Sequence, residues 1–180
     1  MINYKELSKE ISYILRHNPQ EYGLTLDNEG WVDLATLISS LRMQEQYKRL
    51  ESADVESMVL YANKKRHVIH EGRIKALYGH TLKEKIEKEP TQPPEILFHG
   101  TSRKSAENIM KEGLLSQNRQ YVHLSQDKET ASRVGKRKDK NPVILAVEAK
   151  QAWSAGICFY LGNENIWLSD SIPSDFLRKV

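Results

Sequence analysis

Cysteine is the scarcest residue of this 180-residue chain, in which Cys158 stands alone. A lone cysteine excludes an internal disulfide and leaves no Cys/His cluster with the ligand spacing of a zinc site. Because Cys158 lies in the apolar run 157–161, we expect a buried core thiol rather than a nucleophile. Residues 1–10 are polar and contain no signal-peptide core, so we expect a cytoplasmic protein.

Long apolar runs are missing too. No stretch approaches the roughly 18 apolar residues that a membrane-spanning helix needs, so we expect no membrane association. The glycine-rich fingerprints of dinucleotide-binding folds and P-loops do not occur, nor does HExxH or a paired Asp/Glu motif, and we expect no metal. A phosphate-handling enzyme without these features must hold its substrate with Arg and His side chains. Nothing indicates an obligate dimer, and we expect a monomer.

The excess of positive charge is small, because 27 Lys and Arg oppose 24 Asp and Glu and give a net charge of +3. The basic residues nevertheless gather in two clusters, Lys64, Lys65, Arg66, Arg73 and Lys75 in one and Arg133, Lys136, Arg137, Lys138 and Lys140 in the other. Clusters of this kind favour local contacts with anions, although a charge run often forms a solvated loop instead.

A charged and then proline-rich segment, residues 82–94, divides the chain. Its composition is typical of a linker that stiffens toward its end, and it predicts two lobes, 1–90 and 91–180.

Three helices and a β-hairpin are predicted in the first lobe. The first helix spans about 4–16, and Asp33 and Asp54 can cap the other two. Glu71-Gly72 separates two β-prone runs, as in a two-residue hairpin. Three helices followed by a hairpin form the winged-helix pattern, a fold that often binds nucleic acid but by itself proves no function.

Strands dominate the second lobe. The predicted strands are 96–99, 121–125, 143–147, 158–161 and 166–168, and the predicted helices are 102–112 and 127–134. Many strands with few helices indicate an α+β fold with a split or mostly antiparallel sheet.

Arg16 and His17 close the first predicted helix, immediately before Asn18-Pro19. Pro19 stops the helix, so both side chains lie at a rigid helix end. The guanidinium group of Arg16 matches phosphate oxygens, and His17 adds a pH-sensitive donor. Taken alone, such a pair more often only complements the helix dipole.

Two histidines stand out in the second lobe. His99-Gly100-Thr101 ends a predicted strand, where the glycine lets a ligand approach the backbone and its neighbours can bind ribose hydroxyls or an amide. His123 alternates with apolar neighbours and so lies on the opposite face of its strand from them. Each histidine alone is more often a satisfied residue of a turn or core, but two at strand ends favour a shared cleft.

These motifs, in this order, resemble those of the NAD-dependent tRNA/RNA 2′-phosphotransferase family. The resemblance rests on Leu7-Ser8-Lys9, Leu15-Arg16-His17-Asn18-Pro19, Gly23-Leu24, Leu26-Asp27, Gly30-Trp31-Val32, Lys64-Lys65-Arg66, Gly79-His80-Thr81, Phe98-His99-Gly100-Thr101, Gly113-Leu114, Tyr121-Val122-His123-Leu124-Ser125, Val134-Gly135-Lys136-Arg137 and Pro142-Val143. It covers nearly the whole chain, and the joint match is specific although each piece is weak. The chain departs from the family at Tyr78 and Thr81, where glutamine and serine are common.

The resemblance implies an N-terminal winged-helix RNA-binding lobe and a C-terminal NAD-binding lobe of the ADP-ribosyltransferase type. It also implies transfer to NAD of an internal RNA 2′-phosphate, such as tRNA splicing leaves. The 2′-phosphate first attacks C1″ and expels nicotinamide, which gives a 2′-phospho-ADP-ribosylated RNA. The ribose O2″ then attacks the phosphorus, and the products are 2′-hydroxyl RNA and ADP-ribose 1″,2″-cyclic phosphate.

Two sets of site residues follow from the same resemblance. The catalytic set is Arg16, His17, Arg66 and Arg119, with Arg137 competing for the fourth place. The NAD-binding set is His99, Gly100, Thr101, His123, Leu124, Ser125 and Ile166. Ile166 marks the place where protein-modifying relatives carry a catalytic glutamate.

Two other functions stay open. A non-catalytic winged-helix nucleic-acid binder would need no NAD. An ADP-ribosyltransferase acting on terminal nucleic-acid phosphates would use NAD but would leave its product on the RNA end.

Overall fold

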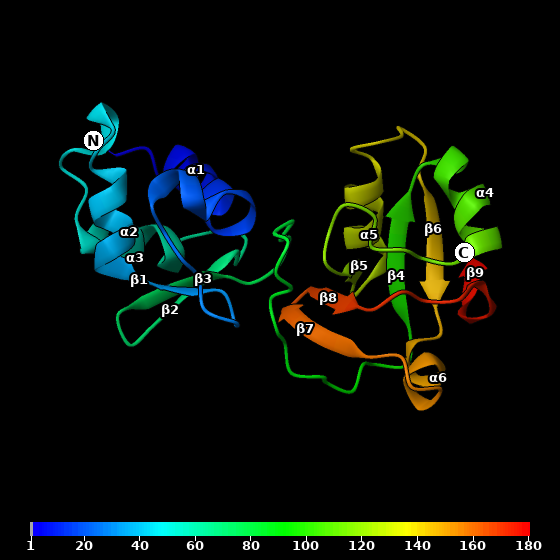
Figure 1. Cartoon of the computed structure of the whole chain (residues 1–180). Coiled ribbons are helices and arrows are strands. Elements are labelled where there is room, and N and C mark those ends of the chain that lie inside the picture. The colour runs from blue at the N-terminus through cyan, green and yellow to red at the C-terminus, as the bar shows by residue number, and fades with distance from the viewer. Residues whose placement is uncertain (1) are drawn as a thin grey trace. The chain divides into compact units, whose positions relative to one another are not determined.

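The computed structural model describes residues 2–180, which fold into two compact units, Met1–Glu87 and Lys88–Val180 (Figure 1). Each unit has its own hydrophobic core, and the sheets of both units are antiparallel. The predicted α+β class with antiparallel sheets is therefore confirmed. Among residues 2–180, no helix is long and apolar enough to cross a bilayer, and no three His, Cys, Asp or Glu side chains gather as metal ligands would.

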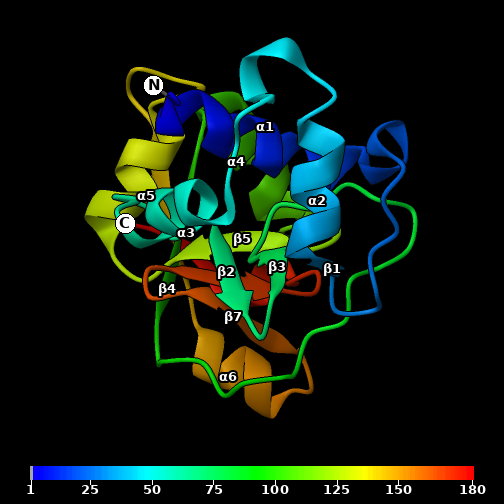
Figure 2. The same ribbon diagram turned by 90° about the vertical axis from the view of Figure 1, so that its left-hand side faces the viewer.

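Unit 1 consists of helices and one small sheet. Its elements are α1 (Tyr4–His17), a 3₁₀ turn (Pro19–Tyr22), β1 (Trp31–Asp33), α2 (Leu34–Leu41), a second 3₁₀ turn (Glu45–Tyr47), α3 (Ser52–Leu60), β2 (His67–His70) and β3 (Arg73–Ala76). The sheet order is β1-β3-β2. Figure 2 shows the hairpin of β2 and β3 with the three helices above it. The apolar stripe of α1 packs with Ile74 and Ala76 of the sheet in a single core.

Helix caps in unit 1 agree with the sequence at one position and differ at another. Asp33 caps α2, because its carboxylate accepts the N–H of Thr36 at 2.7 Å. Asp54 does not cap α3, which begins three residues earlier than expected. Its N-cap is Glu51, and Asp54 accepts the N–H of Glu51 at 2.9 Å to complete a capping box. The sequence suggested Asp54 because glutamate is the less common N-cap residue.

The predicted hairpin is confirmed. Glu71 and Gly72 both have positive φ angles, 48° and 70°, as a two-residue turn with matching twist requires. The sequence missed β1, a strand of three residues that adds to the far side of β3.

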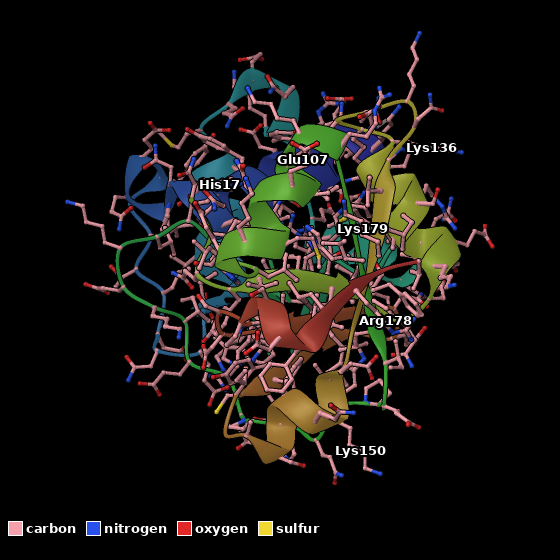
Figure 3. The ribbon with its side chains drawn as sticks, turned by 90° about the vertical axis from the view of Figure 1, so that its right-hand side faces the viewer. His17, Glu107, Lys136, Lys150, Arg178 and Lys179 are labelled. Carbon is pink, nitrogen blue, oxygen red and sulfur yellow. The ribbon has the colours of Figure 1, made fainter. Side chains whose placement is uncertain are left out.

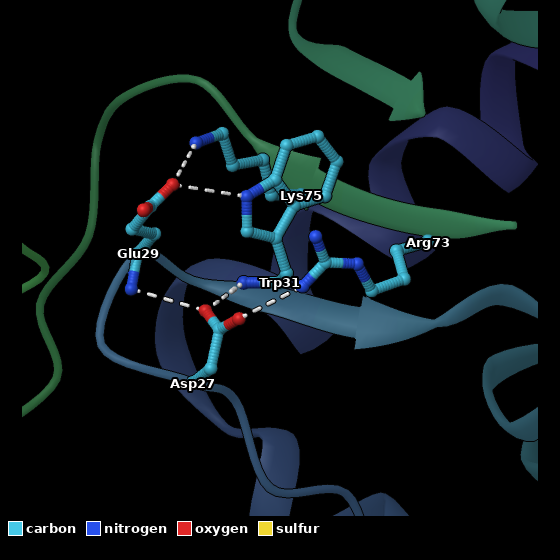
Figure 4. A network of polar contacts seen from close by, with 5 residues as sticks. All are labelled: Asp27, Glu29, Trp31, Arg73 and Lys75. Atoms are coloured by element: carbon cyan, nitrogen blue, oxygen red, sulfur yellow. Dashed lines mark hydrogen bonds and ion pairs between the residues drawn. The ribbon is translucent and has the colours of Figure 1, made fainter. Parts of the chain in front are cut away.

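The basic residues of the hairpin are balanced by acids (Figure 4). Arg73 lies 3.3 Å from an Oδ atom of Asp27, and Lys75 lies 3.4 Å from an Oε atom of Glu29. Both cations also lie over the ring of Trp31, with the Lys75 Nζ 4.4 Å from the ring centroid. Arg73 and Lys75 thereby tie the hairpin to the loop before β1, and the anion contacts expected for the first basic cluster stay a prediction.

Unit 2 contains six strands and three helices among the described residues. They are β4 (Leu97–Thr101), α4 (Arg103–Glu112), β5 (Val122–Ser125), α5 (Lys128–Gly135), β6 (Val143–Val147), α6 (Ala149–Ser154), β7 (Phe159–Asn163), β8 (Ile166–Ser169) and β9 (Leu177–Lys179), with a 3₁₀ turn at Ser174–Phe176. The sheet order is β7-β8-β5-β4-β6-β9. The sequence missed α6 and β9, and Cys158 is half-buried rather than fully buried.

The edge strand β9 carries charged side chains, and Figure 3 labels Arg178 and Lys179 on it. Arg178 donates from Nε to Glu148 at 2.8 Å, and the side chains of Arg178 and Lys179 are exposed. Charges on an edge strand oppose pairing with another chain.

Near the second basic cluster, Asp139 accepts from Arg103 Nε at 3.1 Å and so joins the start of α4 to the loop after α5.

The six-stranded sheet is nearly split between β4 and β5. These strands share one register pair, Phe98 with Ser125, whereas β4 and β6 share pairs along the whole length of β4. The core lies on one face, under α4 and α6, and α5 packs on the other face against β4. The expected split, mostly antiparallel sheet is therefore present in unit 2.

Gly100 is the residue that lets α5 pack on β4, and its substitution tests this packing. A Cβ at Gly100 would lie 1.8 Å from the carbonyl oxygen of Ala131, so the backbone of α5 would have to move. We expect Gly100→Ala to lower the unfolding free energy by about 3 kcal/mol, at the upper end of overpacking effects. Urea denaturation measures this change.

Gly156→Ala is the matched control. Gly156 has a φ of 94°, and an added methyl group there would meet no atom within 4 Å, so the change costs only backbone strain of about 1 kcal/mol. If Gly100→Ala is no more destabilising than Gly156→Ala, the close packing of α5 on β4 is wrong.

Candidate functional site

A pocket of about 440 Å³ runs along α1 in unit 1. Its lining residues are Lys5, Ser8, Lys9, Ser12, Tyr13, Arg16, His17 and Arg66. All but Arg66 come from α1, and Arg66 immediately precedes β2. Three of the predicted catalytic residues, Arg16, His17 and Arg66, are thus brought together. The lining contains four Lys and Arg side chains and no carboxylate, which suits an anion.

The segment that follows β3 fixes Arg16 at the end of α1. The ring centroid of Tyr78 lies 5.1 Å from the Arg16 Cζ, within the range of a cation–π contact. Gly79 passes beside the same side chain with a φ of 93°, and the N–H of Thr81 donates to the Arg16 carbonyl at 2.9 Å. The main chain, the aliphatic part and the guanidinium group of Arg16 are therefore all contacted by this segment.

His17 is held from the same segment. Its Nδ1 lies 2.8 Å from the hydroxyl oxygen of Thr81, and its ring centroid lies 6.1 Å from that of Tyr13. Because Nδ1 of this exposed imidazole contacts Thr81, a proton or hydrogen bond to a ligand would be exchanged at Nε2. Tyr78 and Thr81, the two departures noted in the sequence, are therefore the residues that contact Arg16 and His17.

A buried histidine lies behind the pocket. Ser12 donates its hydroxyl proton to the Ser8 carbonyl at 2.7 Å, so its oxygen accepts from Nε2 of His67 at 3.0 Å. Burial, and then the charges of Arg16 and Arg66, lower the pKa of His67 to about 3. His67 is therefore neutral at physiological pH, mainly because it is buried, and the two arginine charges add to this effect.

Unit 2 brings the other two predicted histidines together. Nδ1 of His99 donates to the His123 carbonyl at 3.0 Å, and Nδ1 of His123 donates to the Tyr121 carbonyl at 3.0 Å. The His123 carbonyl lies where β4 and β5 diverge, so the His99 ring takes the place of a strand N–H. Burial lowers the pKa of His99. In each ring the main-chain contact leaves Nε2 as the acceptor nitrogen.

The remaining residues of the predicted NAD-binding set lie in strands around this split. At Gly100 the space that a Cβ would take is filled by the backbone of α5. Thr101, Leu124 and Ser125 are buried, and Ile166 lies opposite Ser125 in the ladder of β5 and β8. Their part in NAD binding stays a prediction.

Arg119 and Arg137 are both exposed residues of unit 2. The N–H of Arg119 donates to the Ser116 carbonyl in the turn before β5, and the N–H of Arg137 donates to the Val134 carbonyl at the end of α5. The choice between them as the fourth catalytic residue stays a prediction.

Several pocket residues were not predicted as site residues, although Ser8 and Lys9 belong to a motif of the family resemblance. Lys5, Lys9 and Tyr13 lie four residues apart on α1, and Ser8 and Ser12 precede Arg16 at the same spacing. This polar spacing was the available signal, because residues four apart share one helix face. No local pattern pointed to His67, which acts through its contact with Ser12.

Nearly the whole chain is similar to one family of proteins. The model of the family described as "RNA 2′-phosphotransferase, Tpt1 / KptA family" matches residues 3–171. Three relatives, each described as "Probable RNA 2′-phosphotransferase", come from Acetivibrio thermocellus, Bacillus thuringiensis subsp. konkukian and Agrobacterium fabrum. They are 53%, 48% and 41% identical over 99%, 97% and 94% of this chain, and over 98%, 94% and 91% of their own lengths.

The depressed pKa of His67 predicts acid sensitivity. In the unfolded chain the pKa of a histidine is about 6.5, against about 3 for His67 in the folded state. Its contribution to stability is fully present above pH 6.5 and is lost as the pH falls toward 3, at up to about 1.4 kcal/mol per pH unit. We expect the unfolding free energy to fall by about 2 kcal/mol from this residue between pH 6.5 and pH 5.

Urea denaturation at several pH values tests this effect with His67→Gln and His70→Gln. His70 lies exposed at the other end of the same strand and controls for loss of a histidine there. The pH dependence should flatten more in His67→Gln than in His70→Gln. Equal slopes in the two variants would contradict a neutral His67.

Proposed function

Because this chain belongs to the RNA 2′-phosphotransferase, Tpt1 / KptA family, we propose that it removes a 2′-phosphate from RNA by transferring it to NAD. The other products are nicotinamide and ADP-ribose 1″,2″-cyclic phosphate, and the intermediate is the 2′-phospho-ADP-ribosylated RNA. The observation that carries the proposal is the pocket in which Arg16, His17 and Arg66 surround one space without a carboxylate.

The pocket suits a phosphate monoester. Such a group carries about −1.5 to −2 charges at pH 7, and its oxygens are already nucleophilic, so it needs little help from a general base. Arg16 and Arg66 can hold its non-bridging oxygens through their fixed donor forks and keep it in line for attack. The same guanidinium groups stabilise the negative charge when the phosphorus is attacked in the second step. His17 can donate a proton or a hydrogen bond from Nε2.

The hydrogen-bonding groups of unit 2 suit NAD. When bound, NAD supplies the electrophilic carbon and the nicotinamide leaving group. His99 and His123 donate from Nδ1 to main-chain oxygens, so each can accept a hydrogen bond from a ribose hydroxyl at Nε2. Ile166 beside Ser125 gives no carboxylate base, which agrees with a phosphate as the attacking group.

We assign unit 1 as a winged-helix RNA-binding lobe and unit 2 as an NAD-binding lobe of the ADP-ribosyltransferase type. The three helices and hairpin of unit 1 support the first assignment, and the split sheet that holds His99 and His123 supports the second. We further propose that the enzyme acts in the cytoplasm as a monomer, on tRNA-like RNA.

Product analysis tests the proposed reaction. Purified protein, a short RNA with one internal 2′-phosphate and NAD should yield 2′-hydroxyl RNA, nicotinamide and ADP-ribose 1″,2″-cyclic phosphate, by mass spectrometry and without added metal. RNA that gains ADP-ribose only at a terminal phosphate would support the ADP-ribosyltransferase alternative. RNA binding with no release of nicotinamide would support a non-catalytic binder.

In the same assay, Arg66→Ala should lower turnover on the order of 10²–10³-fold, because one preorganised charged donor is removed. Arg49→Ala, which removes an exposed arginine of unit 1 outside the pocket lining, should leave turnover unchanged. Full turnover by Arg66→Ala would remove Arg66 from the phosphate-binding set.

Thr81 tests how His17 is positioned. Thr81→Val keeps the shape of the side chain but removes the hydroxyl 2.8 Å from His17 Nδ1, so kcat should fall on the order of tenfold with little change in KM for RNA. Thr81→Ser restores the hydroxyl and should restore kcat. A Thr81→Ser variant as slow as Thr81→Val would show that the hydroxyl does not orient His17.

A further inference from the structure

The pocket of unit 1 is longer than a phosphate group. Beyond Arg16, His17 and Arg66, its lining continues along the first turns of α1 to Lys5. At 1.5 Å per residue, Lys9 lies about 10 Å and Lys5 about 16 Å along the helix axis from Arg16. A 2′-phosphate alone leaves this part of the pocket unfilled. We call this part, lined by Lys5, Ser8, Lys9 and Tyr13, the α1 groove.

The lysines of the α1 groove suit backbone phosphates. Lys5 and Lys9 are one helical turn apart and exposed on the same face. Lys9 pairs with Glu6 at 2.9 Å, but both side chains are more than half exposed, at 64% and 55%. An ion pair this exposed is worth little, so a phosphate oxygen can replace the carboxylate. An ammonium group on a flexible stem also tolerates the varied geometry of a nucleic-acid backbone.

Tyr13 suits a base. Its side chain is 42% exposed, and its ring lies between the lysines and His17 along α1. Its hydroxyl donates to Glu21 at 3.2 Å and accepts from Asn18 at 3.2 Å. The ring is thereby held in place while it stays open to solvent. A fixed, exposed aromatic ring next to basic side chains is how single-stranded nucleic acids are commonly bound.

We propose that the α1 groove binds the single-stranded RNA on one side of the 2′-phosphate, with backbone phosphates at Lys5 and Lys9 and a base stacked on Tyr13. This proposal rests on the proposed function, since it takes the 2′-phosphate to lie between Arg16 and Arg66. It adds that the nucleotides on one side contribute to affinity and those on the other side do not contact α1.

The test measures RNA binding without NAD, by fluorescence anisotropy. The probes are a 2′-phosphorylated dinucleotide and two longer RNAs that extend it by four nucleotides, one toward the 5′ end and one toward the 3′ end. Wild-type protein should bind one of the extended RNAs at least about tenfold more tightly than the dinucleotide, because the extension adds phosphates for the lysines and a base for Tyr13.

The variant Lys5→Ala/Lys9→Ala should lose the part of that gain that depends on salt and still bind the dinucleotide as the wild type does. The slope of log K against log salt concentration for the favoured RNA should shrink by about 0.7 for each phosphate that is no longer neutralised. Lys48→Ala is the matched control, since Lys48 pairs with Glu45 three residues away, as Lys9 does with Glu6, but lies outside the pocket lining. It should bind every RNA like the wild type.

Tyr13 separates stacking from charge. Tyr13→Phe keeps the ring and should retain most of the gain, whereas Tyr13→Leu should reduce it roughly tenfold with no change in the salt slope. Thermal melting of each variant checks that α1 stays folded.

The proposal is overturned if both RNAs gain equally, if the lysine variant weakens the dinucleotide as much as the longer RNA, or if it weakens neither. Because binding is measured without turnover, its outcome is separate from that of the proposed function. A protein that shows the one-sided gain but forms no product would contradict only the proposed reaction. A protein that forms product without the gain would contradict only the α1 groove.

Discussion

Two guanidinium groups, those of Arg16 and Arg66, share one pocket whose lining has no carboxylate, and the arrangement of unit 1 depends on that constraint. Two like charges in one partly enclosed space repel each other, so their positions must be set by the rest of the fold. The end of α1 positions Arg16, and the segment from Tyr78 to Thr81 closes around it. Burial lowers the pKa of the nearby His67 to about 3, and the charges of Arg16 and Arg66 add to that shift.

Charge balance separates the anion site from other basic residues of the same unit. Arg66 and Lys75 belong to one basic cluster in the sequence, yet they have different surroundings in the structure. Lys75 points away from the core, beside Ile74, and meets Glu29 and the ring of Trp31. Arg66 lines the pocket, where no acid contributes to the lining. The number of lysines and arginines in a segment therefore does not by itself identify an anion site.

Elements with a strong local pattern could be predicted from the sequence. The apolar stripe of α1 followed by Pro19 predicted the helix, and Glu71-Gly72 predicted the hairpin. The missed elements have no such pattern. Strand β1 has three residues and exists because β3 pairs with it, and α6 has six residues. In the site, the positions of Arg16 and His17 could be predicted because both residues lie in the last turn of α1, immediately before the stop at Asn18-Pro19.

The contacts that hold those two residues could not be predicted, because Thr81 lies 64 residues after His17 in the chain. Its importance comes from chain folding and not from its neighbours. The same holds in unit 2, where α5 packs closely on the backbone of Gly100, a contact that no local pattern predicted. A glycine in a strand shows that a backbone approaches closely, but not whose backbone it is.

The histidines of the two units lead to a common electrostatic conclusion. Burial and neighbouring cations keep His67 neutral, and burial does the same for His99 despite its bond to the His123 carbonyl. The four guanidinium and ammonium groups in the pocket lining of unit 1 stay protonated throughout the physiological range. An anion held by such groups loses little affinity between pH 6 and 8 as long as it keeps its own charge. A phosphate monoester, whose second pKa is about 6, gains charge over that range, so the ligand itself contributes a pH dependence to its binding.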